Sequence, residues 1–504
     1  MMLANICQAY CNFWQKHPAL LIGISLLIGS ACCLGFELYY LVVLAALTLT
    51  TSRNLKLFCL STIAILIGFI SILFRYPEVT LASEKLLGVG KFKPQSIKMV
   101  SSPFYRSLLY QGTLIDFQTK EQTYHNIPCS VYLPIYGKRP ICRAIYEIEG
   151  HLEQKSSRLF VLKPTKKKPW ERKAPFLSLI EWRFSAKQLI SKYIHNQVSD
   201  RTTAIFLSAL VTGQIDERLL TMQFGKLGLQ HLLVISGFHF ALLAYLLRSV
   251  FNYLLPFKTT ALMTLLCLSF YYIFLGDSPS IQRAYIAIAA FLMGELIGYP
   301  SSGLNAIGLG LIVELCVLPL SILELGFQLT FLCTLAILLL YQPTEHLLSY
   351  FLPKRTEKER KEMPLIDKYA YSILHLLRSS LSVNIAVHIA TVPLLLYLFH
   401  QFPLLSIAYN LFFPYCVALS CILLFPGLIL YFIPKACSFI FKLNELFSTA
   451  ILHITSYPPL KLQFSLRIDM ITPTMLGLYL TVLFLGAIAF HEKASLPKTS
   501  NPIF

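Results

Sequence analysis

Charged side chains are scarce in this sequence. Of its 504 residues only 13% are Asp, Glu, Lys or Arg, whereas 56% are hydrophobic. An ordinary soluble domain carries about 25% charged residues, so this composition excludes that class. The mean hydropathy of +0.62 and a series of long apolar runs instead predict a polytopic helical membrane protein. The runs do not alternate between apolar and polar residues, as the strands of a transmembrane barrel would.

The sequence also lacks the common motifs of metal and nucleotide chemistry. Its 12 histidines include neither an HxH nor an HExxH spacing, and its 13 cysteines form no metal-ligand grouping. No GxxxxGK[ST] stretch occurs, so ATP hydrolysis would have to come from a partner protein. Ser236-Gly237 lacks the preceding glycine of a nucleophile elbow. We therefore predict no catalytic residue, no metal and no cofactor.

Long apolar runs recur along the chain, and an apolar helix needs about 20 residues to cross a bilayer. We predict about twelve spans, near residues 19–34, 36–51, 57–74, 229–250, 260–276, 281–299, 303–320, 326–341, 381–400, 404–424, 437–454 and 474–490. The runs divide the chain into five segments. These are a transmembrane hairpin with a third span (1–75), a small β domain (76–175), amphipathic interfacial or re-entrant helices (176–228), the main transmembrane domain (229–490) and a short tail (491–504).

The segment 76–175 is the only sizeable stretch outside the apolar runs. Residues alternate at 108–117, 129–135, 142–153 and 158–162, with Gly and Pro between them. This pattern predicts short antiparallel strands compatible with a five-stranded barrel of the OB type. Cys129 and Cys142 share this segment. They could form a disulfide in an oxidising exterior, or remain two buried thiols.

The β domain and the residues after it are basic. From Tyr76 to Asp200 there are 20 Lys and Arg against 10 Asp and Glu, a balance of +10. The densest positive charge comes at Lys166, Lys167, Lys168 and Arg172. Such a stretch suits either nucleic acid or anionic lipid headgroups, and charge alone does not separate the two.

Basic residues between the spans predict the orientation. If the spans alternate, Lys16, Arg53, Lys56 and the charged stretch 354–361 all fall on one side of the membrane. Basic loops favour the cytoplasmic side, so the β domain is expected outside. The predicted fold class is a polytopic α-helical membrane protein of about twelve spans with one small extracytoplasmic OB-like β domain.

One of the apolar runs carries unusual polarity. Residues 229–251 include Gln230, His231, Ser236, Gly237 and His239 inside an otherwise apolar sequence. Polar groups at membrane depth are costly, and they usually face a bundle interior, a water-filled path or each other. Helix-packing polarity is the alternative, because Ser and Gly allow close helix approach and His can bond neighbouring carbonyls.

The order of residues around this run resembles a known family. Residues 228–239 read GLQHLLVISGFH, which is similar to the GLxHLLAISGLHxGLL signature of ComEC-type competence proteins. Three further stretches resemble motifs of that family in the family's order. They are SPSIQRA at 278–284, LGFQLTFL at 325–332 with Thr330 in place of the usual Ser, and ATVPL at 390–394, which is followed by Phe402-Pro403 and by NLFFP at 410–414.

The resemblance implies an inner-membrane channel that passes single-stranded DNA into the cytoplasm of a bacterium, with an OB-like domain at 76–175. It also implies contact with membrane lipids, a separate DNA receptor, a separate cytoplasmic helicase or motor, and a homo-oligomer as one arrangement. Full-length relatives often end in a metallo-β-lactamase-like domain with an HxHxDH motif. This chain ends about 14 residues after its last predicted span, so we expect the nuclease to be a separate protein.

The resemblance places a set of polar residues at or near bilayer depth. A polyanion needs a wet, hydrogen-bonding path with few fixed cations, because phosphates cannot be desolvated in hydrocarbon and many cations would retain the strand. An alternative for the one arginine is that its side chain snorkels to the membrane surface. The predicted path residues are His231, Ser236, Gly237, His239, Arg283, Gln328 and Asn410, and the predicted DNA-binding surface is Lys166, Lys167, Lys168 and Arg172.

Two other classes of function fit the same sequence. One is a polytopic transporter of small or lipid-linked substrates, in which the β domain is an accessory. The other is a membrane-embedded enzyme that acts on headgroups, with His231, Ser236 and His239 as its reactive set. The series of motifs favours DNA transport, and bound DNA rather than a bound small solute would separate the first two.

Overall fold

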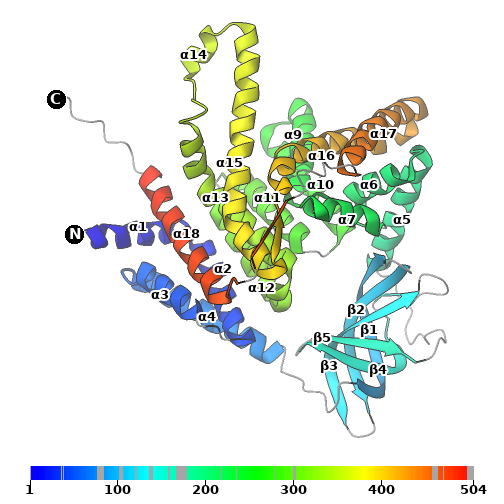
Figure 1. Cartoon of the computed structure of the whole chain (residues 1–504). Coiled ribbons are helices and arrows are strands. Elements are labelled where there is room, and N and C mark those ends of the chain that lie inside the picture. Colours follow the sequence, from blue (N-terminus) through cyan, green and yellow to red (C-terminus); the bar gives the residue numbers. More distant parts are fainter. Residues whose placement is uncertain are drawn as a thin grey trace.

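The computed structural model describes residues 2–35, 37, 39–75, 85–101, 106–119, 122–134, 140–142, 144–156, 159–165, 179–215, 217–233, 235–276, 279–298, 302–456, 464–468 and 470–495. Helices predominate, and a β-barrel lies at one end of the molecule (Figure 1). The helices before the barrel are α1 (Met2–Lys16), α2 (Pro18–Leu34), α3 (Tyr39–Thr51) and α4 (Leu55–Arg75).

Five strands form the barrel. They are β1 (Lys85–Ser101), β2 (Arg106–Gln118), β3 (Thr123–Pro134), β4 (Tyr146–Ser156) and β5 (Leu159–Pro164). The barrel closes in the order β1-β2-β3-β5-β4, with β3 and β5 parallel and the other pairs antiparallel. Inward-facing residues fill it, and Phe92, Tyr110 and Phe117 are fully buried. Closure leaves no unpaired sheet edge.

The sequence predicts four of these strands but misses β1. Gly88, Gly90 and Pro94 interrupt its alternation, and these are residues that usually argue against a strand. In the barrel Gly88 is needed for close packing, because a Cβ at position 88 would lie 2.4 Å from the carbonyl oxygen of Gln118. Glycine therefore lets β1 run close against β2. The pairing of β1 with β2 shifts register at Gly90 and again at Pro94.

The two cysteines of the β domain lie in the barrel core. Cys129 is 4% exposed and Cys142 is 0% exposed. Their sulfur atoms are not bonded to each other, so the first of the two alternatives, a disulfide, is absent. The alternative prediction, two buried sulfurs, describes this arrangement.

The helices after the barrel make up the rest of the molecule. They are α5 (Leu179–Gln197), α6 (Arg201–Thr212), α7 (Arg218–Lys226), α8 (Gln230–Leu233), α9 (Gly237–Leu254), α10 (Phe257–Leu275), α11 (Pro279–Ile297), α12 (Gly303–Val317), α13 (Leu325–Leu348), α14 (Glu357–Glu362), α15 (Leu365–Phe399), α16 (Leu405–Ile429), α17 (Pro434–Ser456) and α18 (Pro473–Ser495). Each predicted apolar run lies largely within one helix, except 229–250, which α8 and α9 share.

Within the described residues, seven helices are long and apolar enough to cross a membrane, or eight if α1 and α2, bent by 98°, make one span. This count is lower than the predicted twelve. The helices α3 and α12 are apolar but shorter than a full span. Polar and charged residues interrupt two others, Arg248 in α9 and Lys442 and Glu445 in α17. The chain is nonetheless mostly helical with several candidate spans, as expected of a polytopic membrane protein.

Helix α6 is a short buried helix. The sequence predicts a partly inserted or re-entrant element there, because its apolar stretch is too short to cross a membrane. In the structure every residue from Thr203 to Thr212 is buried by surrounding protein. Asp200 caps its start by accepting a hydrogen bond from the backbone N–H of Thr203, and Gly213, at φ 68°, ends it in the left-handed conformation.

Helix α5 joins the barrel to the membrane helices. Its residue Glu181 accepts a hydrogen bond from the backbone N–H of Cys142 at 2.9 Å, and Phe184 packs against the barrel core. One turn further along, Lys187 donates to the carbonyl of Leu275 at 2.7 Å, at the carboxyl end of α10. A cation at this end of a helix interacts favourably with the helix dipole. The basic face of α5 therefore contacts α10.

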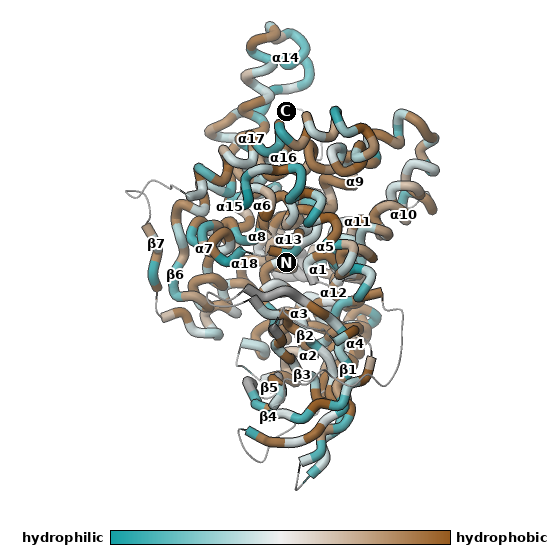
Figure 2. The backbone as a smooth tube through the Cα atoms, turned by 90° about the vertical axis from the view of Figure 1, so that its right-hand side faces the viewer, coloured by the Kyte–Doolittle hydropathy of each residue, from teal (hydrophilic) through white to brown (hydrophobic). Residues whose placement is uncertain are grey.

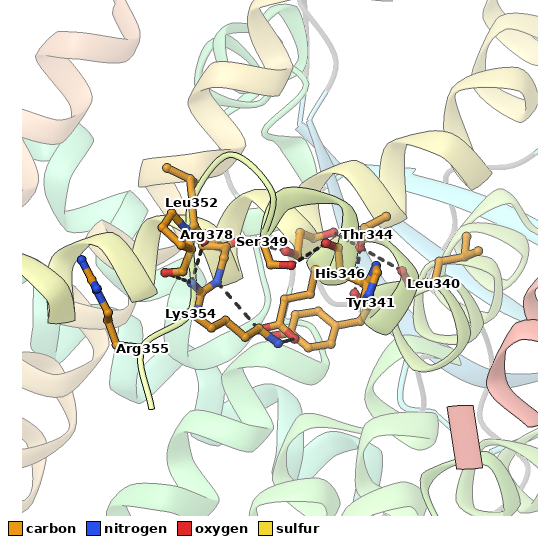
Figure 3. A network of polar contacts seen from close by, with 12 residues as sticks. Leu340, Tyr341, Thr344, His346, Ser349, Leu352, Lys354, Arg355 and Arg378 are labelled. Atoms are coloured by element: carbon orange, nitrogen blue, oxygen red, sulfur yellow. Dashed lines mark hydrogen bonds and ion pairs between the residues drawn. The ribbon is translucent and has the colours of Figure 1, made fainter. Parts of the chain in front are cut away.

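A polar network connects α13 to α15 (Figure 3). Arg378, which is 1% exposed, donates to the carbonyls of Leu352 and Pro353 at 2.9 and 3.2 Å. Lys354 lies 2.9 Å from the carboxylate of Glu345. These contacts fix the chain that leaves α13 to the middle of α15, at Arg378.

Helix α15 extends far beyond this network. Its 35 residues span about 52 Å at 1.5 Å per residue, whereas the hydrocarbon core of a bilayer is about 30 Å thick. No residue of α15 before Arg378 is buried. Figures 1 and 2 both place α14, beside the start of α15, at the opposite end of the molecule from the barrel.

Candidate functional site

The first motif lies at a break between two helices. The sequence predicts one continuous span over 229–250, and this is wrong, because α8 ends at Leu233 and α9 begins at Gly237. Ser236 is extended, with φ −122° and ψ 177°, and occupies the N-cap position of α9. Serine favours this position because its side chain can satisfy unpaired N–H groups of the first helical turn. The polar residues of the motif therefore mark a helix start rather than one face of a long helix.

His239 folds back onto this helix start. Its Nδ1 lies 3.2 Å from both the backbone nitrogen and the Oγ of Ser236. Accepting the backbone N–H at Nδ1 places the proton of a neutral imidazole on Nε2. The side chain is 2% exposed, and Nε2 has no hydrogen-bond partner among the described residues. His239 therefore presents an N–H donor to the interior of the bundle.

Two further histidines lie within electrostatic range of this site. His231, on α8, is exposed and interacts electrostatically with His239 and with His388 of α15. The Nδ1 of His388 contacts the carbonyl of Asn384 one turn earlier, at 2.7 Å. In the described part of the chain no three His, Cys, Asp or Glu side chains are arranged to hold a metal ion.

The start of the first motif contacts α16. Gly228 has φ 68°, and a Cβ at this position would lie 2.6 Å from the Cβ of Ser406. Glycine is therefore required for both backbone conformation and space. The Oγ of Ser406 accepts a hydrogen bond from Asn410 Nδ2 at 3.2 Å. Asn384 of α15 donates to the carbonyl of Ile407 at 2.7 Å. The first and the last motif thus meet beside the histidines.

The second motif contacts both the first and the third. A Cβ on Gly237 would lie 3.8 Å from the Cβ of Ala284. The neighbouring Arg283 is only 6% exposed, and its Nη2 donates to the carbonyl of Gly326 at 3.2 Å. The Arg283 side chain is therefore enclosed by the surrounding helices.

Two aromatic rings of α13 enclose the arginine. The guanidinium carbon of Arg283 lies 4.5 Å from the centre of the Phe331 ring and 5.6 Å from that of Phe327. These are cation–π distances. Gln328 lies on the same helix, and its Nε2 donates to the carbonyl of Ile322 at 3.0 Å. The structure thus brings the four motifs together through direct contacts.

A family model described as competence protein matches residues 211–493. The match covers more than half of the chain. This chain belongs to the competence protein family. ComE operon protein 3 of Bacillus subtilis (strain 168) is 26% identical over 245 residues, which are 46% of this chain and 27% of that protein. The aligned part thus spans about a quarter of that relative. No solved structure matches the chain.

The matched competence region holds all seven predicted path residues. The sequence does not single out Ser406, Phe327 or Phe331 as partners of these residues. The two phenylalanines lie in an apolar run where an aromatic ring gives no sign that a cation lies over it. Ser406 is not distinguished by its own sequence surroundings, since only the left-handed conformation of Gly228 brings the two together.

The predicted DNA-binding residues Lys166, Lys167, Lys168 and Arg172 lie outside the described residues. The nearest described basic side chain before them is Lys163. It forms an ion pair of 2.6 Å with Glu153 on β4. This hydrogen bond from Lys163 is the largest cause that lowers the pKa of Glu153.

Proposed function

We propose that this competence protein forms the path by which single-stranded DNA crosses the bacterial inner membrane. The observation that carries this proposal is the convergence of the four motifs. Gly237 lies against Ala284, Arg283 bonds the carbonyl of Gly326, and Gly228 lies against Ser406. These contacts gather distant parts of the chain into one polar region inside an apolar bundle.

The chemistry of this region suits a passing polyanion. Phosphodiester groups need hydrogen-bond donors when they leave water, and Asn410, His239 and Arg283 carry donors of three kinds. One arginine supplies positive charge without a continuous row of cations, which would hold the strand through many phosphate contacts. In the described state the Phe331 and Phe327 rings cover Arg283, so we propose that the path widens there when DNA enters.

The barrel is proposed to be an OB-type domain on the outer side of the membrane. Five strands closing in the order β1-β2-β3-β5-β4 support this assignment. The end of the molecule opposite the barrel carries the basic stretch 354–361, and basic loops favour the cytoplasm. If the network of Arg378 marks the membrane surface, the start of α15 projects into the cytoplasm.

We further propose that the barrel and the basic residues after it receive the DNA strand. Lys166, Lys167, Lys168 and Arg172 would contact phosphates, so binding should weaken steeply with salt. Anionic vesicles offer the competing ligand. If charge reversal of the three lysines changes binding to vesicles but not to single-stranded DNA, the stretch is a membrane anchor instead. A separate receptor, nuclease and motor would supply the DNA strand and the driving force.

A deletion strain tests the function directly. Labelled DNA should still bind at the cell surface but should no longer reach the cytoplasm, and the full chain supplied in trans should restore entry. A transporter of small or lipid-linked substrates predicts unchanged DNA entry in the deletion strain. A headgroup enzyme predicts the same, together with altered lipid composition.

A further inference from the structure

Glu314 is a buried carboxylate without a hydrogen-bond donor. It lies on α12 and is 0% exposed. Neither of its carboxylate oxygens has a partner among the described residues. Burial of a carboxylate is costly unless a positive charge or several donors compensate it. A charged carboxylate here depends on positive charge that lies near it without bonding it directly.

Arg283 supplies a positive charge within electrostatic range of Glu314. The two side chains interact electrostatically, although no ion pair within 4.0 Å joins them. The Nε and Nη1 of Arg283 are also buried without a partner in the described structure. Gly310, one turn before Glu314, leaves room for the arginine, because a Cβ there would lie 3.8 Å from Arg283 Cγ.

The partly buried Arg248 shows a contrasting arrangement. Arg248 of α9 donates through Nη1 to both carboxylate oxygens of Glu295 on α11, at 3.0 and 2.8 Å. In that pair each charge is compensated by a direct hydrogen-bonded contact with the other. Arg283 and Glu314 are opposite charges on neighbouring helices that attract each other while several of their polar atoms stay unbonded.

We propose that Glu314 is a counter-charge that sets how tightly Arg283 holds a passing phosphodiester group. This proposal rests on the proposed function. Because no hydrogen bond joins the two side chains, the Nε and Nη1 of Arg283 can donate to a phosphate while Nη2 keeps its bond to the carbonyl of Gly326. The carboxylate then attracts the guanidinium back and repels the phosphate. Glu314 thus shortens the lifetime of each contact between Arg283 and a phosphate, so that the strand passes instead of remaining bound.

The experiment measures equilibrium binding of a fluorescent single-stranded 20-mer to the purified full-length protein in nanodiscs. Glu314→Gln removes the charge at nearly constant shape, and Glu314→Leu does so with an apolar side chain if the first variant does not fold. We expect binding about tenfold tighter than wild type, a typical size for coupling between two sites. The matched control is Glu295→Gln, which should leave binding unchanged because Arg248 lies in the other pair.

A double variant separates this role from a general effect of removing negative charge. In Arg283→Gln/Glu314→Gln the gain should vanish, since the counter-charge acts only through the arginine. Unchanged binding in Glu314→Gln, an equal gain in Glu295→Gln, or a gain that persists in the double variant would overturn the proposal. DNA entry that survives deletion of the whole chain would instead refute the proposed function, and this is measured separately in cells.

Discussion

At the scale of single residues, the two glycines of the first motif differ in how well they should tolerate a side chain. Gly228 combines φ 68° with a Cβ position 2.6 Å from the Ser406 side chain. Gly237 has ordinary space, with Ala284 at 3.8 Å from its Cβ position. A methyl group should therefore be tolerated at 237 and not at 228, whereas a leucine at 237 would force α9 and α11 apart.

We expect Gly228→Ala to lower the free energy of unfolding by at least about 2 kcal/mol, from left-handed backbone strain and overpacking together. Thermal unfolding of the purified protein in detergent measures this, and Gly237→Ala is the matched control with little change. The double variant Gly228→Ala/Ser406→Gly should recover part of the loss because it removes the clash. Equal stability of the two single alanine variants would contradict this account.

Lys187 gives a residue-scale prediction about pH. Burial against α10, with a smaller effect of Arg183, lowers the pKa of Lys187 to about 8, from about 10.4 in an unfolded chain. The charged form is thus disfavoured in the folded protein, and stability should rise as pH increases from about 8 toward 10.4.

Acylation of Lys187 measures the same titration, because only the neutral amine reacts. Peptide mass spectrometry across a pH series should give a midpoint near 8 for the folded protein. The denatured protein is the control and should give a midpoint near 10.4. Identical midpoints in the two states would show that α10 does not desolvate this amine.

At the scale of elements, the barrel core protects its cysteines. Cys129 is 4% exposed, and burial raises the pKa of its thiol, so little reactive thiolate forms at neutral pH. We expect Cys129 to resist alkylation in the native protein and to react after denaturation without a reductant. Rapid native alkylation would contradict the packed core. A mass corresponding to a Cys129–Cys142 bridge would contradict the absence of a disulfide.

The positions of most elements could be predicted from local sequence, because an apolar run marks a buried or lipid-facing helix wherever it packs. Their lengths could not. Ser236 ends the continuity of the run 229–250 by capping α9. The amphipathic start of α15 gives no long apolar signal, so the prediction begins at residue 381 while the helix begins at Leu365.

The candidate site, too, could be predicted only in part from the sequence. Local sequence singles out the polar residues of the motifs, because polarity inside an apolar run is visible without a structure. Their partners depend on contacts between segments far apart in the chain. The Phe331 ring over Arg283 and the Ser406 side chain against Gly228 are of this kind. Periodicity and composition carry no information about such contacts.

At the scale of the whole molecule, the barrel and α14 lie at opposite ends, which predicts opposite sides of the membrane (Figures 1 and 2). Thr123→Cys on β3 should react in intact cells with a membrane-impermeant maleimide. Lys358→Cys on α14 should react only after permeabilisation. Both positions are exposed, and the unmodified chain controls for its native cysteines. The reverse pattern would invert the orientation, and equal labelling would contradict a membrane between the two ends.

The central claim is that the region where the four motifs meet is the path of DNA, and its most direct measurement is the entry of labelled DNA into the cytoplasm. His239→Ala removes an interior N–H donor, and Arg283→Ala removes the positive charge of the second motif. His375→Ala, on the exposed start of α15, is the control. With equal protein levels in the membrane, the account predicts loss of entry in both path variants and normal entry in the control. Near-normal entry in both His239→Ala and Arg283→Ala would contradict it and leave these residues with a role in packing alone.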